Sequence, residues 1–136
     1  LEEVMINHNR AGQVGEAMET ILESARRDRE LEISVQEVAS DQAGERRYRL
    51  IDIREPWERD IAHIAGDEFM TRELAYEIMQ NSPRDAALVF YCHTGRRTLE
   101  AAAYFRGHGF TNAMSMAGGI EAWSLQIDPD VQRYSK

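Results

Sequence analysis

One stretch constrains the chain most: an apolar run ends at the only cysteine, and a helix-forming run begins six residues later. The apolar run is Ala87–Tyr91, the cysteine is Cys92, and the helix-forming run starts near Thr98. A short apolar run of this kind predicts a buried strand. A cysteine between a strand and a helix N-terminus faces free backbone N–H groups and the positive end of the helix dipole. Such a position stabilises a thiolate, so we expect Cys92 to act as a nucleophile.

The loop after the cysteine combines a glycine with two arginines. Gly95 allows a tight loop whose amides turn inward. Arg96 and Arg97 set a positive local field inside a chain whose formal net charge is −8. A lone cysteine is often only a packing residue, but open α/β sheets place their sites at the carboxyl ends of strands. We therefore expect a reactive cysteine that meets a small anionic substrate.

The composition argues against several other classes of protein. The net charge of −8 disfavours a general nucleic-acid binder. A single cysteine excludes an internal disulfide and a cysteine-rich zinc site. No apolar run reaches the roughly 18 residues that suggest a membrane span, so no membrane partner is expected. We expect a cytoplasmic protein, although the chain starts at Leu1 rather than Met and native residues can be missing before it.

Predicted strands and helices alternate along the chain, which favours an α/β fold with a mostly parallel sheet and helices on both faces. Strands are expected near 32–34, 48–53, 68–70, 87–91 and 112–116. Helices are expected near 35–39, 56–61, 72–80, 98–108 and 120–125. Ser34 and Thr71 are the expected N-caps of two of these helices. Residues from Asp128 onward are predicted to form a surface tail.

The N-terminal part is set apart from the rest. Residues 1–31 are predicted to be an extension that carries an amphipathic helix, and residues 32–136 a single domain. Residues 1–12 are polar and mixed, so we expect them to be loosely ordered. The apolar positions that follow share one helix face: Val14, Ala17, Met18, Ile21, Leu22 and Ala25. Two interpretations stay open for this face: packing on its own domain, or docking to a partner or a second subunit.

Several separated motifs carry a resemblance to a known family. They are Leu50–Pro56, His63–Gly66, Tyr91–Thr98, and Gly109-Phe110 followed by Gly118–Trp123. In their order and spacing the chain resembles a rhodanese-homology domain of the sulfurtransferase superfamily, over roughly residues 32–126. The resemblance implies a five-stranded parallel sheet flanked by helices on both faces.

The resemblance also implies a reaction. Cys92 would attack the outer sulfur of a donor such as thiosulfate, and a cysteine persulfide would form. The terminal sulfur would then pass to a thiophilic acceptor such as cyanide, a thiol or a sulfur-accepting protein. The loop amides and the helix dipole would stabilise both the thiolate and the persulfide anion. Neither a metal nor an organic cofactor is needed for these steps.

The family resemblance assigns roles within the active-site loop. After the catalytic Cys92, this loop comprises His93, Thr94, Gly95, Arg96, Arg97 and Thr98. Arg97 is expected to order the loop or contact the substrate, and Arg96 to lie at its rim. For Thr98 two interpretations stay open: it caps the following helix, or its hydroxyl faces the sulfur. His93 is expected at the rim rather than as a general base, because side chains of such a loop point outward while its amides point in.

Residues outside the loop are expected to support it. Asp52 and Arg54 are predicted to form a structural ion pair beneath the loop. His63 matches the signature histidine of the family, which looks structural there. The family usually has Gly-His-Ile-Pro-Gly-Ala where this chain has Ala62–Asp67. The pair Gly118-Gly119 is expected to make a turn that lets the backbone approach closely.

Three other functions were weighed against direct sulfur transfer to a small acceptor. Related phosphatases and arsenate reductases of this fold resemble Cys-x5-Arg, whereas this loop is Cys-x4-Arg and the longer spacing would end on Thr98. A phosphoryl group needs the wider loop, so sulfur transfer is favoured. A persulfide relay that feeds a partner protein is the main alternative. A non-catalytic binding domain is disfavoured, since such members typically lack the cysteine.

Overall fold

The computed structural model describes the backbone of residues 2–135 and the side chains of residues 14–135. The chain divides into two compact units, residues 1–30 and residues 31–136. Within the described residues, no helix is long and apolar enough to cross a membrane.

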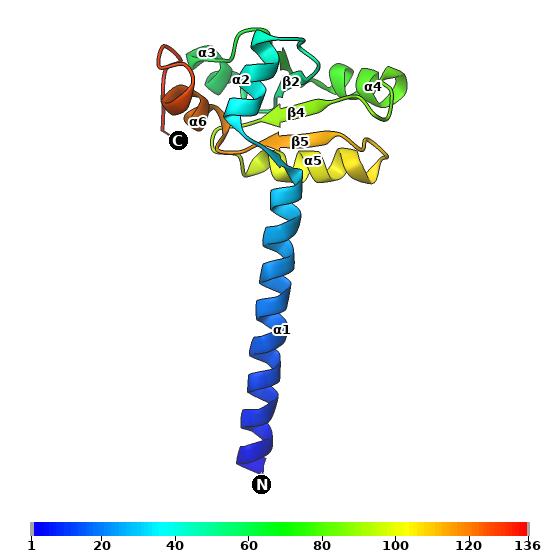
Figure 1. The fold of residues 1–136 in the computed structure, drawn as a ribbon, viewed down its shortest axis with the longest axis vertical. Coiled ribbons are helices and arrows are strands. Elements are labelled where there is room, and N and C mark those ends of the chain that lie inside the picture. Colours follow the sequence, from blue (N-terminus) through cyan, green and yellow to red (C-terminus); the bar gives the residue numbers. More distant parts are fainter. Residues whose placement is uncertain (1, 136) are drawn as a thin grey trace. The chain divides into compact units, whose positions relative to one another are not determined.

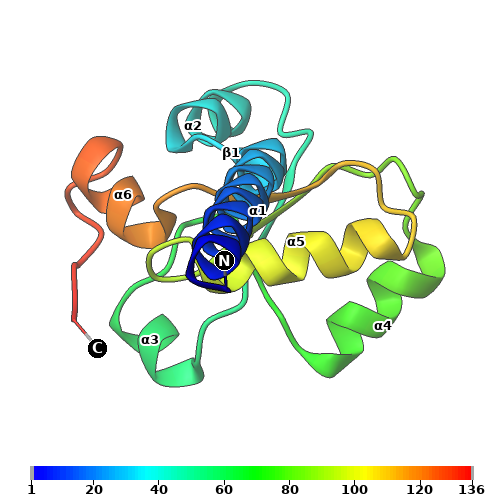
Figure 2. The ribbon, with the colours of Figure 1, turned by 90° about the horizontal axis from the view of Figure 1, so that it is seen from below.

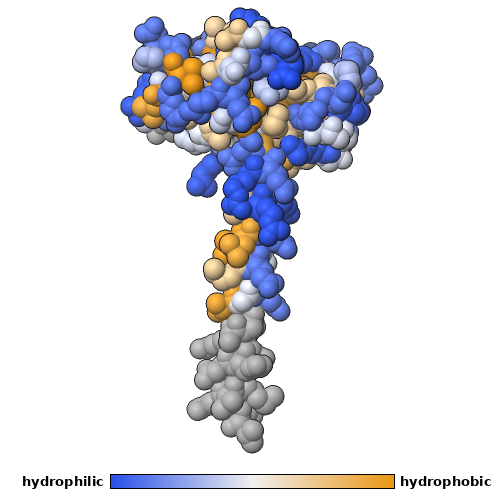
Figure 3. Space-filling view, in the orientation of Figure 1, coloured by the Kyte–Doolittle hydropathy of each residue, from blue (hydrophilic) through white to orange (hydrophobic). Residues whose placement is uncertain are grey.

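The first unit is a single helix, α1, which runs from Glu2 to Leu31. The helix begins at Glu2 and not after residue 12 as predicted, while the loose order expected of residues 1–12 stays a prediction. Four large apolar side chains of the predicted stripe are each more than half exposed: Val14, Met18, Ile21 and Leu22. Figure 3 shows these hydrophobic side chains gathered along one part of α1. Packing of this face on its own domain and docking to a partner or a second subunit both stay predictions.

The second unit is built on one parallel sheet, as predicted (Figure 1). Its strands are β1 (Glu32–Ile33), β2 (Arg49–Asp52), β3 (Glu68–Phe69), β4 (Leu88–Tyr91) and β5 (Ala113–Met116). The strand order is β1-β5-β4-β2-β3, so β4 is the central strand. Asp52 pairs with both Tyr91 and Phe69, and this register brings the carboxyl ends of β2, β3 and β4 to the same edge.

Helices cover both faces of the sheet. They are α2 (Val35–Ala43), α3 (Pro56–Ile61), α4 (Arg72–Asn81), α5 (Arg97–Gly107) and α6 (Gly119–Gln126). Figure 2 shows α2 and α6 on one side of the unit and α4 and α5 on the other. This layout explains the unbroken apolar run of β4, because a strand that is covered on both faces has no polar side.

The central strand divides its side chains between two hydrophobic clusters. Val89 and Tyr91 pack with residues of α2 and α6, whereas Leu88 and Phe90 pack with residues of α4 and α5. All four side chains have 0 % exposure. The alternation follows from the two-residue period of a strand. It fixes the register of β4, and with it the point at which the strand ends and the cysteine loop begins.

Local capping signals mark the N-termini of two helices where the sequence predicts them. The Ser34 hydroxyl accepts a hydrogen bond from the backbone N–H of Glu37 at 3.1 Å, and the Thr71 hydroxyl accepts one from Leu74 at 3.0 Å. The surface tail predicted from Asp128 onward is only partly exposed, and the prediction is wrong for two of its residues. Val131 and Tyr134 pack against the cluster that contains Val89.

Candidate active site

Cys92 follows the last residue of β4 and lies at the carboxyl edge of the sheet. Its residue exposure is 1 %. The sulfur accepts a hydrogen bond from the backbone N–H of Gly95, with 3.2 Å between nitrogen and Sγ. It also lies 3.6 Å from the hydroxyl oxygen of Thr98. The sulfur is therefore held by polar groups of the loop that follows it, as expected for a site that stabilises a sulfur anion.

The loop owes its shape to a close approach by the start of α6. The backbone N–H groups of Ile120 and Glu121 donate to the carbonyl oxygens of Cys92 and His93, at 2.9 and 3.1 Å. Gly119 lies so close that a Cβ atom there would come within 2.5 Å of both oxygens. The predicted close approach at the paired glycines is thus confirmed. Because carbonyl and N–H groups of a planar peptide point in opposite directions, the N–H groups of His93 and Thr94 point away from α6.

Thr98 lies inside α5 and is not its cap. The helix begins at Arg97, and the Thr98 side chain has 0 % exposure. Its hydroxyl oxygen lies 2.7 Å from the Ser115 hydroxyl and 3.3 Å from the carbonyl oxygen of Gly95. Of the two predicted positions for Thr98, the structure shows the one in which the hydroxyl faces the sulfur. Ser115 was not predicted; it is a buried polar residue of β5 whose partner lies in another element.

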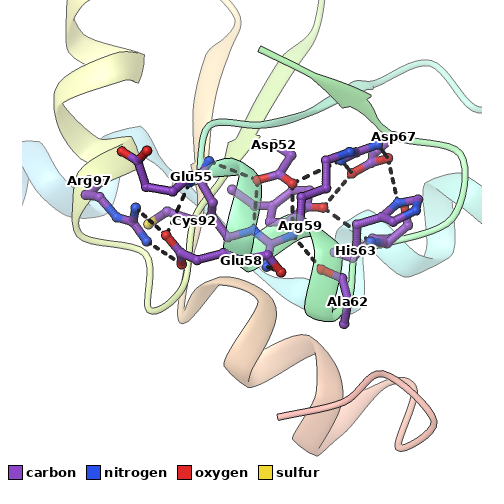
Figure 4. Close-up of polar contacts among 12 residues, drawn as sticks. Asp52, Glu55, Glu58, Arg59, Ala62, His63, Asp67, Cys92 and Arg97 are labelled. Carbon is purple, nitrogen blue, oxygen red and sulfur yellow. Dashed lines mark hydrogen bonds and ion pairs between the residues drawn. The ribbon is translucent and has the colours of Figure 1, made fainter. Parts of the chain in front are cut away.

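Arg97 is bound by a buried carboxylate. Its two terminal nitrogens donate to the two carboxylate oxygens of Glu58, both at 3.0 Å (Figure 4). The Glu58 side chain has 0 % exposure, and Arg97 has 33 %. Burial by itself raises the pKa of Glu58, but hydrogen bonds from Arg97 and Tyr134 outweigh it and lower that pKa to about 2. Arg97 therefore ties the start of α5 to α3, and of its two predicted roles this contact favours ordering of the loop.

Glu58 itself was missed by the sequence analysis, although a local signal for it exists. Pro56 occupies the first turn of α3, Glu55 is its N-cap, and the side chains of Glu55 and Glu58 form a capping box. The backbone N–H of Glu55 donates to Glu58 Oε1 at 3.2 Å. A carboxylate three residues after the N-cap is the usual sign of this arrangement. The sign predicts a cap, but it does not predict that the same carboxylate binds Arg97.

Asp52 and Arg54 form the predicted ion pair. Arg54 donates to both carboxylate oxygens of Asp52 at 2.8 Å, and both side chains have 0 % exposure. A further bond of 2.7 Å joins Arg54 to the carbonyl oxygen of Ala62. A buried charge pair is tolerated only where its remaining donors are also satisfied, which Arg54 achieves with backbone and side-chain acceptors. The pair joins the end of β2 to the segment after α3.

His63 belongs to a second part of the same polar network. Its Nδ1 lies 3.1 Å from Asp67, and its side chain is 46 % exposed. Asp67 also accepts from Arg59 and from the hydroxyl of Tyr91. Burial raises the pKa of Asp67, but hydrogen bonds from Arg59 and Tyr91 outweigh it and lower the value. In Figure 4, His63 and Asp67 lie at the opposite end of the network from Cys92. His63 thus contacts the support of the site rather than the loop.

His93 packs against a residue that the sequence analysis left in the surface tail. Its ring stacks on that of Tyr134, with 4.2 Å between centroids and 15° between planes. The Tyr134 hydroxyl donates to Glu58 at 2.6 Å and accepts from Arg54 at 3.1 Å. No local signal marks Tyr134, because its partners lie more than 40 residues earlier in the chain.

Thr94 and Arg96 are the exposed members of the loop. Within residues 14–135, no ion pair involves Arg96, whereas Arg97 is paired with Glu58. Only one of the two predicted arginines is thus open to an anion in solution. Among the side chains that the structure describes, no group of three or more His, Cys, Asp or Glu could hold a metal ion.

Comparison with known proteins assigns the family. The chain matches the family described as Rhodanese-like domain over residues 34–126. The chain belongs to this family. The family and the fold predicted from the sequence are thereby confirmed, and α1 lies outside the matched residues.

Two named relatives and one solved structure illustrate the likeness. The chain is 41 % identical over 91 residues to the probable adenylyltransferase/sulfurtransferase MoeZ of Mycobacterium tuberculosis, covering 65 % of this chain and 23 % of that protein. It is 31 % identical over 87 residues to the thiosulfate sulfurtransferase GlpE of Ectopseudomonas mendocina. This match covers 64 % of this chain and 80 % of GlpE. The human single-domain sulfurtransferase TSTD1 superposes with a TM-score of 0.59 at 26 % identity. This match covers 71 % of this chain and 96 % of TSTD1. The chain therefore spans about a quarter of MoeZ but most of GlpE and TSTD1.

Proposed function

We propose that this protein is a sulfurtransferase that carries a sulfane sulfur as a persulfide on Cys92. The observation that carries the proposal is the setting of the Cys92 sulfur: it lies at the carboxyl end of the central strand, 3.2 Å from the Gly95 N–H and 3.6 Å from the Thr98 hydroxyl. Family membership supports sulfurtransferase activity in general. The name of the GlpE relatives supports thiosulfate as the donor to test first.

The proposed reaction has two displacements at sulfur. The Cys92 thiolate attacks the outer sulfur of thiosulfate, the sulfur–sulfur bond of the donor breaks, and sulfite leaves with the bonding electron pair. Cyanide then attacks the outer sulfur of the Cys92 persulfide, thiocyanate leaves, and the thiolate is regenerated. The thiol proton passes to solvent before the first step. No net oxidation occurs, because the sulfane sulfur is transferred without an external oxidant or reductant.

The loop supplies the electrostatics for both steps. The Gly95 N–H and the Thr98 hydroxyl lie where negative charge resides on the thiolate and on the persulfide. Preorganised donors of this kind stabilise charge without reorganisation at the moment of reaction. Arg96 is exposed and attracts the anionic donor, while Arg97 holds the loop through Glu58. The carbonyl contacts to α6 keep the loop in this shape.

Mass spectrometry of the intact protein tests the proposal. After incubation with thiosulfate, we expect one added sulfur atom on Cys92, and cyanide should remove it with release of thiocyanate. Cys92→Ser is the matched variant and should neither gain sulfur nor turn over. If the wild type gains no sulfur from thiosulfate or from a persulfide donor, or if Cys92→Ser keeps turnover, the proposal is wrong. Hydrolysis of p-nitrophenyl phosphate would instead favour phosphatase chemistry.

A second candidate keeps the Cys92 persulfide but delivers its sulfur to a partner protein. The exposed apolar stripe of α1 favours it, because four large side chains there are open to solvent. Slow turnover with cyanide, together with fast loading from the persulfide of another protein, would support this relay. A truncated chain that begins at residue 31 would then load from thiosulfate normally but lose transfer to or from that protein.

A further inference from the structure

Residues 127–135 return from the end of α6 to the active-site edge of the sheet. The Ser124 hydroxyl donates to the carbonyl oxygen of Val131 at 2.6 Å, and Arg133 donates to Glu121 at 2.7 Å. These bonds tie Val131 and Arg133, which follow the turn at residues 129–130, to α6. Tyr134 is therefore held at the site by its own segment, and it also packs edge-on against Trp57 with 6.0 Å between ring centroids.

Tyr134 contacts the active-site loop directly at His93 and is linked to it a second time through Glu58. Its ring stacks on His93, the residue directly after the cysteine. Its hydroxyl donates to Glu58 Oε2, the same oxygen that accepts a bond from Arg97. One side chain is thus linked to the loop directly at His93, near its beginning, and through Glu58 at Arg97, where α5 begins.

The Glu58 carboxylate depends on Tyr134 for its orientation. Its Oε1 accepts from Arg97 and from the backbone of Glu55, and its Oε2 accepts from Arg97 and from Tyr134. A buried carboxylate must have its lone pairs satisfied, and the side chain has no exposed surface through which water could replace the phenol. Loss of the Tyr134 hydroxyl would leave Glu58 Oε2 with one hydrogen-bond donor and weaken the bidentate contact between Glu58 and Arg97.

We propose that Tyr134 is a positioning residue of the sulfur-transfer site, which holds the Cys92 loop through Glu58 and Arg97 at one end and through His93 at the other. The inference rests on the proposed sulfurtransferase function and adds to it a residue outside the part of the chain that matches the family, residues 34–126. It also gives residues 127–135 a defined role, in which they hold the loop in the shape that loads sulfur.

Two substitutions separate the two contacts. Tyr134→Phe removes the bond to Glu58 and keeps the ring on His93, and it should slow loading of Cys92 by thiosulfate about tenfold, as expected for one hydrogen bond to a charged group. Tyr134→Ala removes both contacts and should slow loading further, so that phenylalanine partly rescues what alanine loses. Tyr76→Phe is the matched control, since Tyr76 is 69 % exposed, and it should load like the wild type.

A double-mutant cycle shows whether Tyr134 acts through Glu58. In a Glu58→Gln background, Tyr134→Phe should slow the loading of Cys92 by little more, because the carboxylate that Tyr134 orients is already absent. Circular dichroism and melting curves establish that each variant is folded. If Glu58→Gln does not fold, Arg97→Gln replaces it in the cycle, because Arg97 is one-third exposed.

A second readout makes failure of this inference distinguishable from failure of the proposed function. Modification of Cys92 by 5,5′-dithiobis(2-nitrobenzoate) requires no sulfur transfer, and a loosened loop should admit this bulky reagent faster than the wild type does. Slower loading with faster modification supports the role of Tyr134. Unchanged modification in folded Tyr134→Phe and Tyr134→Ala, or effects that add fully to those of Glu58→Gln, would overturn it. Absence of a persulfide in the wild type would reject the sulfurtransferase proposal, while the modification rates would still decide the role of Tyr134.

Discussion

Replacement of Glu58 by glutamine should destabilise the protein by about 3 kcal/mol at pH 7. The change keeps the size of the side chain but removes a buried carboxylate that accepts two bonds from Arg97 and one from Tyr134. A pKa of about 2, against an ordinary value of 4.5, corresponds to about this free energy, since each pKa unit is worth about 1.4 kcal/mol. Breaking a buried ion pair typically costs about 3–5 kcal/mol, and the partial exposure of Arg97 favours the lower end.

The loss should depend on pH in a defined direction. The folded-state pKa of Glu58 lies below its unfolded value, so the ionised carboxylate stabilises the fold fully above about pH 5. This contribution is lost as the pH falls from about 5 to 2, because the unfolded chain takes up the proton at a higher pH than the folded protein does. The glutamine variant has nothing to titrate at this position. The difference between the two proteins should therefore shrink by about half by pH 3.

Urea unfolding at pH 7, 5, 4 and 3 measures the difference in unfolding free energy between the wild type and Glu58→Gln. At pH 7 the melting temperature of the variant should be lower by about 10 °C. Glu73→Gln is the matched control on an exposed position, and its effect should stay within about 0.5 kcal/mol. A loss below about 1 kcal/mol at pH 7 would refute the argument that Glu58 is an essential buried counter-charge. A difference that persists unchanged at pH 3 would refute the linkage to its ionisation.

Three further substitutions test the geometry around Cys92. Thr98→Val should slow persulfide loading about tenfold, whereas Thr94→Val, at an exposed position, should not. Equal loading rates in the two variants would show that the hydroxyl near the sulfur does not contribute to loading. Gly119→Ala should cost about 2 kcal/mol or more in urea unfolding, because its Cβ would come within 2.5 Å of two loop carbonyls at a φ of +61°; an unchanged midpoint would contradict that contact. Arg96→Ala should raise the KM for thiosulfate several-fold, keep kcat and weaken the salt dependence, and an unaltered KM would argue against charge-guided binding.

The sheet and most of the cysteine loop could be predicted because their signals are local. Ala87–Tyr91 is apolar at every position because β4 is covered on both faces. This unbroken apolar run predicts a buried strand from the sequence alone. The helix caps at Ser34 and Thr71 depend on residues three positions away. The spacing from Cys92 to Arg97 is likewise a property of neighbouring residues.

The parts that were missed depend on partners far apart in the chain. Glu58 and Arg97 are separated by 39 positions, and Tyr134 and Glu58 by 76. Ser115 is buried in a strand, and its partners are the Thr98 hydroxyl and the Gly95 carbonyl oxygen. The capping-box spacing marks Glu58 only as a helix cap, and nothing in the sequence near Tyr134 or Ser115 distinguishes it from an ordinary surface tyrosine or serine. Their roles come from the fold as a whole.

The burial of Cys92 has a consequence for the chemical durability of the site. With 1 % exposure, the unloaded thiol offers solvent almost no surface, so peroxide and other oxidants meet it rarely. Loading extends the side chain by one sulfur–sulfur bond of about 2 Å, so the transferable atom lies beyond the position that the unloaded sulfur occupies. Between turnovers the same burial preserves the nucleophile. On the proposed mechanism, the depth of the sulfur protects the site, and Cys92 is the single cysteine of the sequence.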